Sequence, residues 1–89
     1  MKSILTVIGK DQVGIIAGIS SELQKYNINI LNVNQTIMNG YFTMIMMLEH
    51  VNKNESFEKV KKALQEKGKE LKVEVKIQNK EIFDSMHSL

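Results

Sequence analysis

The spacing of apolar and polar positions divides this chain into six segments of regular structure. Residues 2–8 form a dense aliphatic run, which is typical of a central strand. From residue 13 to residue 26 the apolar residues recur every three or four positions, which predicts an amphipathic helix. The later pattern predicts strands over 30–38 and 41–51, a helix over 52–68 and a strand over 71–78.

The dipeptide Asn39-Gly40 joins the second and third predicted strands. Both residues tolerate positive φ, so this pair favours a two-residue type I′ hairpin turn. The turn would pair Met38 with Tyr41 and fix the register of both strands. The pairs expected on the mostly apolar face are Ile37 with Phe42, Gln35 with Met44, Val33 with Met46 and Leu31 with Leu48. The other face of the hairpin is half polar.

The second helix and the last strand have their own boundary signals. Asn52 or Asn54 is expected to cap the helix and Gly68 to end it. The segment "LKVEVKIQ" then alternates strictly, as an edge strand with one exposed face does. Its expected inward side chains are Leu71, Val73, Val75 and Ile77.

The element order βαββαβ predicts an α+β fold, the ferredoxin-like split βαβ sandwich. Such a sandwich has a four-stranded antiparallel sheet with two helices on one face, and its other face is open. Residues 1–79 would form this single domain. Residues 80–89 would form a short helical tail that packs on the domain or on a dimer partner, because its apolar residues have near-helical spacing. These are Ile82, Phe83, Met86 and Leu89.

Composition narrows the function. The 89 residues include no Cys, which excludes disulfides, thiolate zinc sites and cysteine nucleophiles. All twelve basic residues are Lys, so direct reading of nucleic acid is disfavoured, because guanine and phosphate are bound bidentately by Arg. No window resembles a signal peptide or a membrane span, and we expect a cytoplasmic protein.

Residues that could support catalysis or bind a cofactor are scarce. Gly9, Gly14 and Gly18 match neither the dinucleotide-binding nor the phosphate-loop spacing. His50 and His87 have no second histidine at helical spacing and no triad-like neighbour. The "MIMM" run at 44–47 is better explained by core packing than by a copper site. We therefore expect no enzyme activity, no metal and no cofactor.

The corner at residues 9–15 joins the first strand to the first helix and allows two interpretations. In the first, Asp11 caps the helix and Gly14 lets the helix and strand backbones approach. In the second, free N–H groups of the first helical turn bind an anionic ligand such as a carboxylate. Asn32 and Asn34 on the next strand would then offer amide groups to an amino group.

The stretch "DQVGIIAGISSELQKYNINILNVNQTI" resembles the signature of ACT domains. It has an acidic residue and a glycine that open the first helix, and "NIN" leads into the second strand. The segments "QT" at 35–36 and "YFTM" at 41–44 and the ending "IQNKEIFDSMHSL" are similar to stand-alone ACT proteins related to the glycine-cleavage-system repressor type.

The resemblance implies a non-enzymatic regulatory module that binds an amino acid and works as a homodimer or higher oligomer. In the family, the ligand lies between the loop after the first strand and the second strand of a neighbouring protomer. By position, these residues are Asp11, Gln12, Val13, Gly14 and Ile15 in the loop, and Asn32, Asn34 and Gln35 on the strand. Without an attached output domain, regulation would pass through a separate protein partner. The alternative is a scaffold that uses the ACT fold only for oligomerisation or partner docking.

Overall fold

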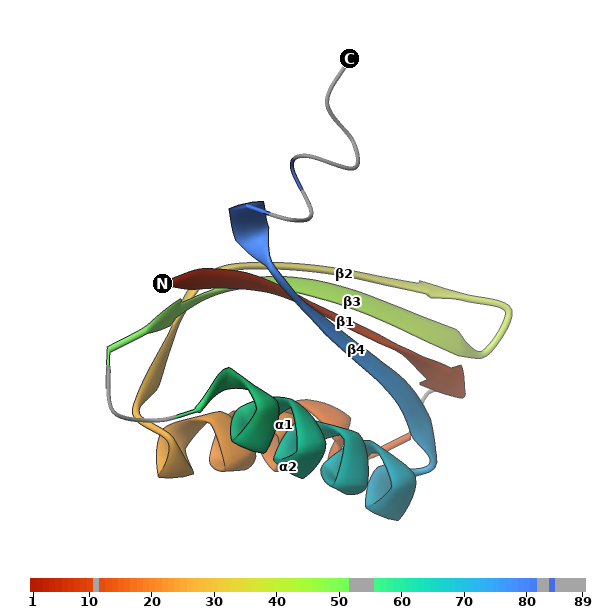
Figure 1. The fold of residues 1–89 in the computed structure, drawn as a ribbon. Helices are drawn as coiled ribbons and strands as arrows, with labels where there is room; N and C mark the ends of the chain where they lie inside the picture. The colour runs from red at the N-terminus through yellow and green to blue at the C-terminus, as the bar shows by residue number, and fades with distance from the viewer. Residues whose placement is uncertain (11, 52–55, 82–83, 85–89) are drawn as a thin grey trace.

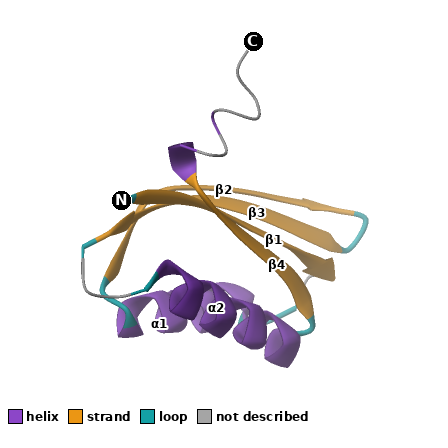
Figure 2. Cartoon of the chain, in the orientation of Figure 1, coloured by secondary structure: helices purple, strands orange, loops and turns teal. Residues whose placement is uncertain are grey.

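The computed structural model describes residues 1–10, 12–51, 56–81 and 84 of the chain. Four strands and two helices follow one another in the predicted order (Figures 1 and 2). They are β1 (Lys2–Lys10), α1 (Ile15–Lys25), β2 (Ile28–Met38), β3 (Tyr41–His50), α2 (Phe57–Leu71) and β4 (Val73–Asn79).

The strands form one antiparallel sheet in the order β2-β3-β1-β4. Both helices, α1 and α2, lie on the same face of this sheet, and among the described residues no helix lies over the middle of the other face (Figure 1). The ferredoxin-like sandwich predicted from the sequence is therefore confirmed. The order also confirms β1 as a central strand and β4 as an edge strand, and it places β2 at the opposite edge.

The hydrophobic core lies between the two helices and the inner strands. Alternate residues of β3 point at the helices and are almost fully buried, as the apolar spacing predicted; these are Phe42, Met44, Met46 and Leu48. The helices contribute buried side chains at the predicted positions, which include Ile19, Leu23, Val60 and Leu64. From β2, only Ile28 joins this cluster. The core is therefore centred on β1, β3 and β4.

The β2–β3 hairpin has the register counted outward from Asn39-Gly40. Both turn residues have positive φ, 53° and 80°, as a type I′ turn requires. Met38 pairs with Tyr41, and the predicted pairing holds back to Asn32 with Met47. An irregularity between Ile30 and Asn32 then shifts the register, so that Ile30 instead of Leu31 pairs with Leu48. An extra residue of this kind is a β-bulge, which the apolar pattern does not reveal.

The end of α2 differs from the prediction. Gly68 does not terminate the helix, which continues to Leu71 and ends at Lys72 with φ 61°. Leu71 is therefore the last helical residue and not the first inward residue of the last strand. Gly68 is buried where α2 crosses β4, and a Cβ there would lie 2.6 Å from Cγ2 of Val75. The glycine is needed for a close helix–strand approach and not as a helix stop.

The start of α2 also differs. The N-cap is Ser56, with extended backbone at φ −70° and ψ 132°, and its side chain makes no capping hydrogen bond. The predicted caps Asn52 and Asn54 lie outside the described residues. Glu58 is the acidic residue of the first turn, and its negative charge interacts favourably with the positive end of the helix dipole.

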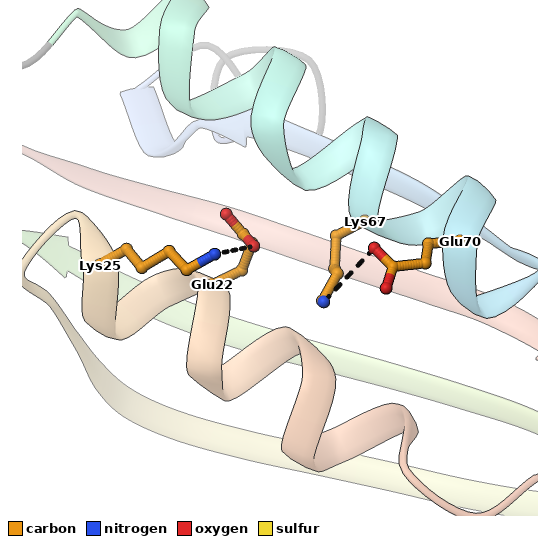
Figure 3. Close-up of polar contacts among 4 residues, drawn as sticks. All are labelled: Glu22, Lys25, Lys67 and Glu70. Carbon is orange, nitrogen blue, oxygen red and sulfur yellow. Dashed lines mark hydrogen bonds and ion pairs between the residues drawn. The ribbon is translucent and has the colours of Figure 1, made fainter.

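Ion pairs line the seam between the two helices. Glu22 of α1 is buried and accepts a hydrogen bond from Lys25 at 3.1 Å, while Lys67 of α2 lies 3.5 Å from Glu70. Figure 3 shows the side chains of Glu22 and Lys67 projecting from their own helices into the space between them. Because Glu22 is paired with Lys25, its carboxylate avoids the free-energy cost of a buried charge without a partner.

Replacing Gly68 with Ala should destabilise the fold by about 1–2 kcal/mol, because the clash with Val75 outweighs the gain in helix propensity. Gly18→Ala in α1 is the matched control. Its Cβ would approach only the tip of the Leu71 side chain, at 2.9 Å, which can rotate away. Urea unfolding of both variants measures the difference. Equal stabilities for the two would contradict the close approach of α2 to β4.

Ser3 and His50 form a buried polar link between β1 and β3. The Ser3 Oγ atom lies 2.6 Å from Nε2 of His50, and the histidine ring lies 6.0 Å from the ring of Phe57 at the start of α2. Ser3 is fully buried, so its hydroxyl is closed to any substrate and the pair serves structure. Burial, and then the charge of the N-terminus, lower the pKa of His50 below 6.5, although Glu49 opposes them.

This lowered pKa gives stability a pH dependence. The folded state binds a proton on His50 less readily than the unfolded state, so the stabilisation is complete above the ordinary pKa and is lost as the pH falls through the folded value. We expect the free energy of unfolding to decrease from about pH 7 to about pH 5, and to decrease less in His50→Gln. Urea unfolding at several pH values measures both slopes. Identical slopes would show that His50 does not carry the effect.

Candidate ligand-binding site

The predicted loop lies between the end of β1 and the start of α1. Gln12, Val13 and Gly14 are exposed, whereas Ile15 is 2% exposed and points into the core. Asp11 lies outside the described residues. Ile15 could therefore offer a ligand only its backbone, while Gln12, Val13 and Gly14 are exposed to solvent.

Gly14 is the N-cap of α1, and its backbone has φ 97°. A side chain there would meet no atom within 4 Å, so the expected close approach of helix and strand at Gly14 is wrong. The glycine serves the left-handed turn instead, which other residues adopt at a cost of about 1–2 kcal/mol. This turn leads directly into α1, whose first N–H groups have no partner within the helix. They form the positive end of the helix dipole and suit an anion.

Gln12 ties the loop to the second helix. Its Nε2 atom donates a hydrogen bond to the backbone carbonyl of Leu71, the last residue of α2. That carbonyl is one of the acceptors that a helix leaves without an internal partner. The side chain of Gln12 therefore already has a structural role. One N–H of its amide and its carbonyl oxygen remain for further hydrogen bonds.

The strand residues of the predicted site lie on two faces of β2. Asn32 and Asn34 pair with Met47 and Ile45, which places them on the open face. Gln35 pairs with Met44 and lies on the helix side. All three are exposed. Met38 lies at the end of the sheet where the loop is. Asn34 is four residues from Met38 along β2, so it lies about 13 Å from that end, measured along the strand. One chain therefore does not bring the loop and the two asparagines together.

The helix side of β2 carries an apolar row, in which Ile30 takes the place that the predicted register gave to Leu31. Ile30, Val33 and Ile37 share this face with Met44 and Met46 but are 39%, 45% and 55% exposed. On the neighbouring helix, Ile16 is also exposed. The amino-acid pattern alone cannot distinguish such a row from a buried one, because both have the same alternation. The row is a surface feature because the helices cover β4, the other edge strand, and leave β2 largely uncovered.

Other kinds of site find little support in the described part of the chain. No group of three or more His, Cys, Asp or Glu side chains there could hold a metal ion. No helix within the described ranges is long and apolar enough to cross a membrane. The loop, the first turn of α1 and the strand β2 are the parts of the predicted site that the structure leaves accessible.

Comparison with known proteins agrees with this geometry. A family model described as ACT domain matches residues 3–78. A UPF0237 protein of Listeria innocua is 54% identical over 89 residues, which cover all of both chains. The solved structure of an ACT domain protein from Streptococcus pneumoniae has a TM-score of 0.84 and 36% identity and covers 94% of each chain.

The expected relation to repressors of the glycine cleavage system also has a structural counterpart. A candidate glycine cleavage system transcriptional repressor has a TM-score of 0.76 at 17% identity, and the match covers 86% of this chain and 44% of that one. At this identity the likeness concerns the fold alone. The family model and the relatives that match along their full length decide the assignment, and this chain belongs to the ACT-domain family.

Proposed function

We propose that this protein is a regulatory module that binds a small ligand, an amino acid, where two copies of the chain meet. ACT domains are regulatory rather than catalytic domains, which supports a binding role. The main structural support is the exposed edge strand β2, which has ten exposed residues among its eleven. A cytoplasmic location, the lack of enzyme activity and a separate regulatory partner stay predictions of the sequence.

An exposed edge strand of this length favours pairing with a second chain. Its free N–H and C=O groups can extend the sheet, and Ile30, Val33 and Ile37 would gain cover on the helix side. Such pairing is antiparallel when a two-fold axis relates the copies. Antiparallel pairing places the part of one β2 that carries Asn32 and Asn34 toward the end of the other β2 that lies near the loop. A dimer could thus bring Gln35, on the helix side of one β2, toward the loop of the other chain.

In this dimer the eight predicted residues have distinct roles. Backbone N–H groups of Val13, Gly14 and Ile15 would bind the ligand carboxylate at the positive end of α1. Asp11 and Gln12 would set specificity from the same loop. On the partner strand, Gln35 lies on the helix side, as α1 does, and would offer its side-chain amide to the amino group. Asn32 and Asn34 lie on the open face, so their predicted roles would need a ligand that reaches past the edge of the sheet. The alternative is a ligand-free scaffold that uses the same β2 surface only to oligomerise.

A thermal-shift panel of the amino acids tests ligand binding. A true ligand at a hundredfold excess over its dissociation constant should stabilise the protein by about 2.7 kcal/mol. Gly14→Ala should lose this shift, because the altered turn displaces the N–H groups. Gly40→Ala is the matched control, since its φ is 80° and a Cβ there also meets no atom within 4 Å. Both variants should lose similar basal stability, and only the first should lose binding.

If no amino acid raises the melting temperature of the unmodified protein, the scaffold alternative is favoured. If both glycine variants keep the ligand shift, the ligand binds elsewhere. Isothermal calorimetry on the same variants separates these outcomes from a general loss of folding.

The oligomer interface has its own test. Ile37→Lys places a charge at the hairpin end of the apolar row of β2 and should convert the dimer to a monomer, because a charge in an apolar contact has no partner. Light scattering coupled to size exclusion measures the mass. Glu74→Lys on β4, the opposite edge, is the control and should leave the mass unchanged. A dimer that survives Ile37→Lys but dissociates with Glu74→Lys would place the interface at β4.

A further inference from the structure

A groove follows the free edge of β4 on the helix side of the sheet. α2 lies beneath this strand (Figure 1), and three neighbouring hollows of about 330, 200 and 370 Å³ are lined by both elements. Ile77 lines the first two hollows and Gln65 lines the last two, so the three form one groove. Its floor is apolar, because Val73, Val75 and Ile77 point toward the helices and are buried.

The wall that α2 contributes to this groove is mainly basic. It consists of four side chains on one side of the helix, which are Glu58, Lys61, Gln65 and Lys69. Glu58 lies at the end of the groove near the start of α2. Lys61 is half-buried and Lys69 is exposed, and neither forms an ion pair with another described residue. The groove therefore presents two positive charges that have no acidic partner in the described part of the chain.

The strand side of the groove can pair with a further strand. β4 has seven residues and pairs only with β1, so every second residue presents its N–H and C=O groups away from the sheet. Glu74 and Lys76 lie on its open face, and their charged groups are 3.9 Å apart, so their charges largely cancel. The excess of positive charge at this edge therefore comes from α2.

The two unpaired lysines are spaced to match a strand. Lys61 and Lys69 are eight residues apart on the helix, which is about 12 Å along its axis. Residues i and i+4 of a strand point to the same side and are about 13 Å apart. Lys69 lines the hollow at 73–75. Lys61 lines the one at 77–79, so α2 runs antiparallel to β4. A strand added to β4 would present its i and i+4 side chains to the lysines and its i+2 side chain to Gln65.

We propose that the groove between β4 and α2 binds an extended, acidic segment of another protein, which joins the sheet as a fifth strand. The segment carries acidic side chains at i and i+4, opposite Lys61 and Lys69. Its side chain at i+2 is apolar and lies over the buried valines of the groove floor. Backbone hydrogen bonds to β4 supply affinity, and the side chains on the helix side select the sequence.

The charges at the two sheet edges distinguish this partner from a second copy of the chain. Antiparallel pairing of two β4 strands in one sheet would place both α2 helices on the same side, with the lysines of one copy facing those of the other. Repulsion between like charges opposes this arrangement. β2, at the other edge, contains no charged residue. Self-association through β2 would therefore leave the groove free.

This inference is independent of the proposed ligand site and of the proposed dimer, because β2 and β4 are opposite edges of the sheet. It is also independent of the predicted tail. Residues 82, 83 and 85–89 of that tail lie outside the described part of the chain.

Fluorescence polarisation with a labelled peptide tests the groove in the full-length protein. The probe is Thr-Glu-Thr-Val-Thr-Glu-Thr, whose two Glu and one Val lie on the same face of a strand. The unmodified protein should bind this probe more tightly than the same peptide with Lys in place of Glu. Lys61→Glu, Lys69→Glu should weaken binding of the probe about tenfold, because two attractive charge pairs become repulsive.

Lys10→Glu, Lys62→Glu is the matched control. It changes the net charge by the same amount, and neither lysine lines the groove. The control should keep nearly all of the affinity for the probe. Equal losses in the two double variants would show that only net charge matters and would overturn the proposal. Equal binding of the Glu and Lys peptides by the unmodified protein would also overturn it.

NMR spectra of the unmodified protein locate the bound peptide. Addition of the probe should shift the backbone amide signals of β4 and leave those of β2 in place. Shifts confined to β2 would contradict the proposal and would place strand addition at the other edge. If neither peptide binds, the proposal is wrong, and the lysines serve only to keep the β4 edge from pairing.

Discussion

The packing of two helices against one face of a four-stranded sheet determines most of this structure. α1 and α2 bury the helix-facing residues of β1, β3 and β4, and the closest approach is at Gly68, which fits against Val75 only because it has no side chain. β2 receives almost none of this cover, and only Ile28 of that strand joins the core. The exposed edge and its apolar row therefore follow from the placement of the helices, and they are what makes self-association chemically reasonable.

The same packing positions the loop that opens α1. Gln12 donates to the end of α2, and the left-handed turn at Gly14 directs the chain into the first helical turn. The C-terminal end of α2, which presents carbonyl groups, and the N-terminal end of α1, which presents N–H groups, thus meet at one corner. The carbonyl of Leu71 accepts a hydrogen bond from Gln12, whereas Gly14, the N-cap residue of α1, has no side chain that could cap the N–H groups. This asymmetry, rather than any single side chain, is the physical basis of the proposed anion site.

Local signals accounted for much of the fold. Asn39-Gly40 fixed the hairpin register from Met38 back to Asn32, because a two-residue turn leaves no freedom in the count. The register failed at Leu31, where a bulge breaks the alternation without any marker in the pattern. The prediction that Gly68 ends the helix was wrong. The amino-acid sequence does not distinguish a glycine that allows close packing from a glycine that caps a helix. The helix stops at Lys72 instead, once α2 has crossed β4.

The sequence by itself determined the order of the elements, most of the inward side chains and the family, because apolar period and turn chemistry are local properties. Leu31 and Leu71 are the inward positions that it placed wrongly. Only the tertiary structure decided which inward residues are buried. Val33 and Met46 are paired neighbours on one face, yet Val33 is exposed and Met46 is buried, because the helices cover β3 and do not cover β2. It also showed that the loop and the asparagines lie apart in one chain. Burial and the distance between sites depend on how elements pack across the whole chain, which no local pattern encodes.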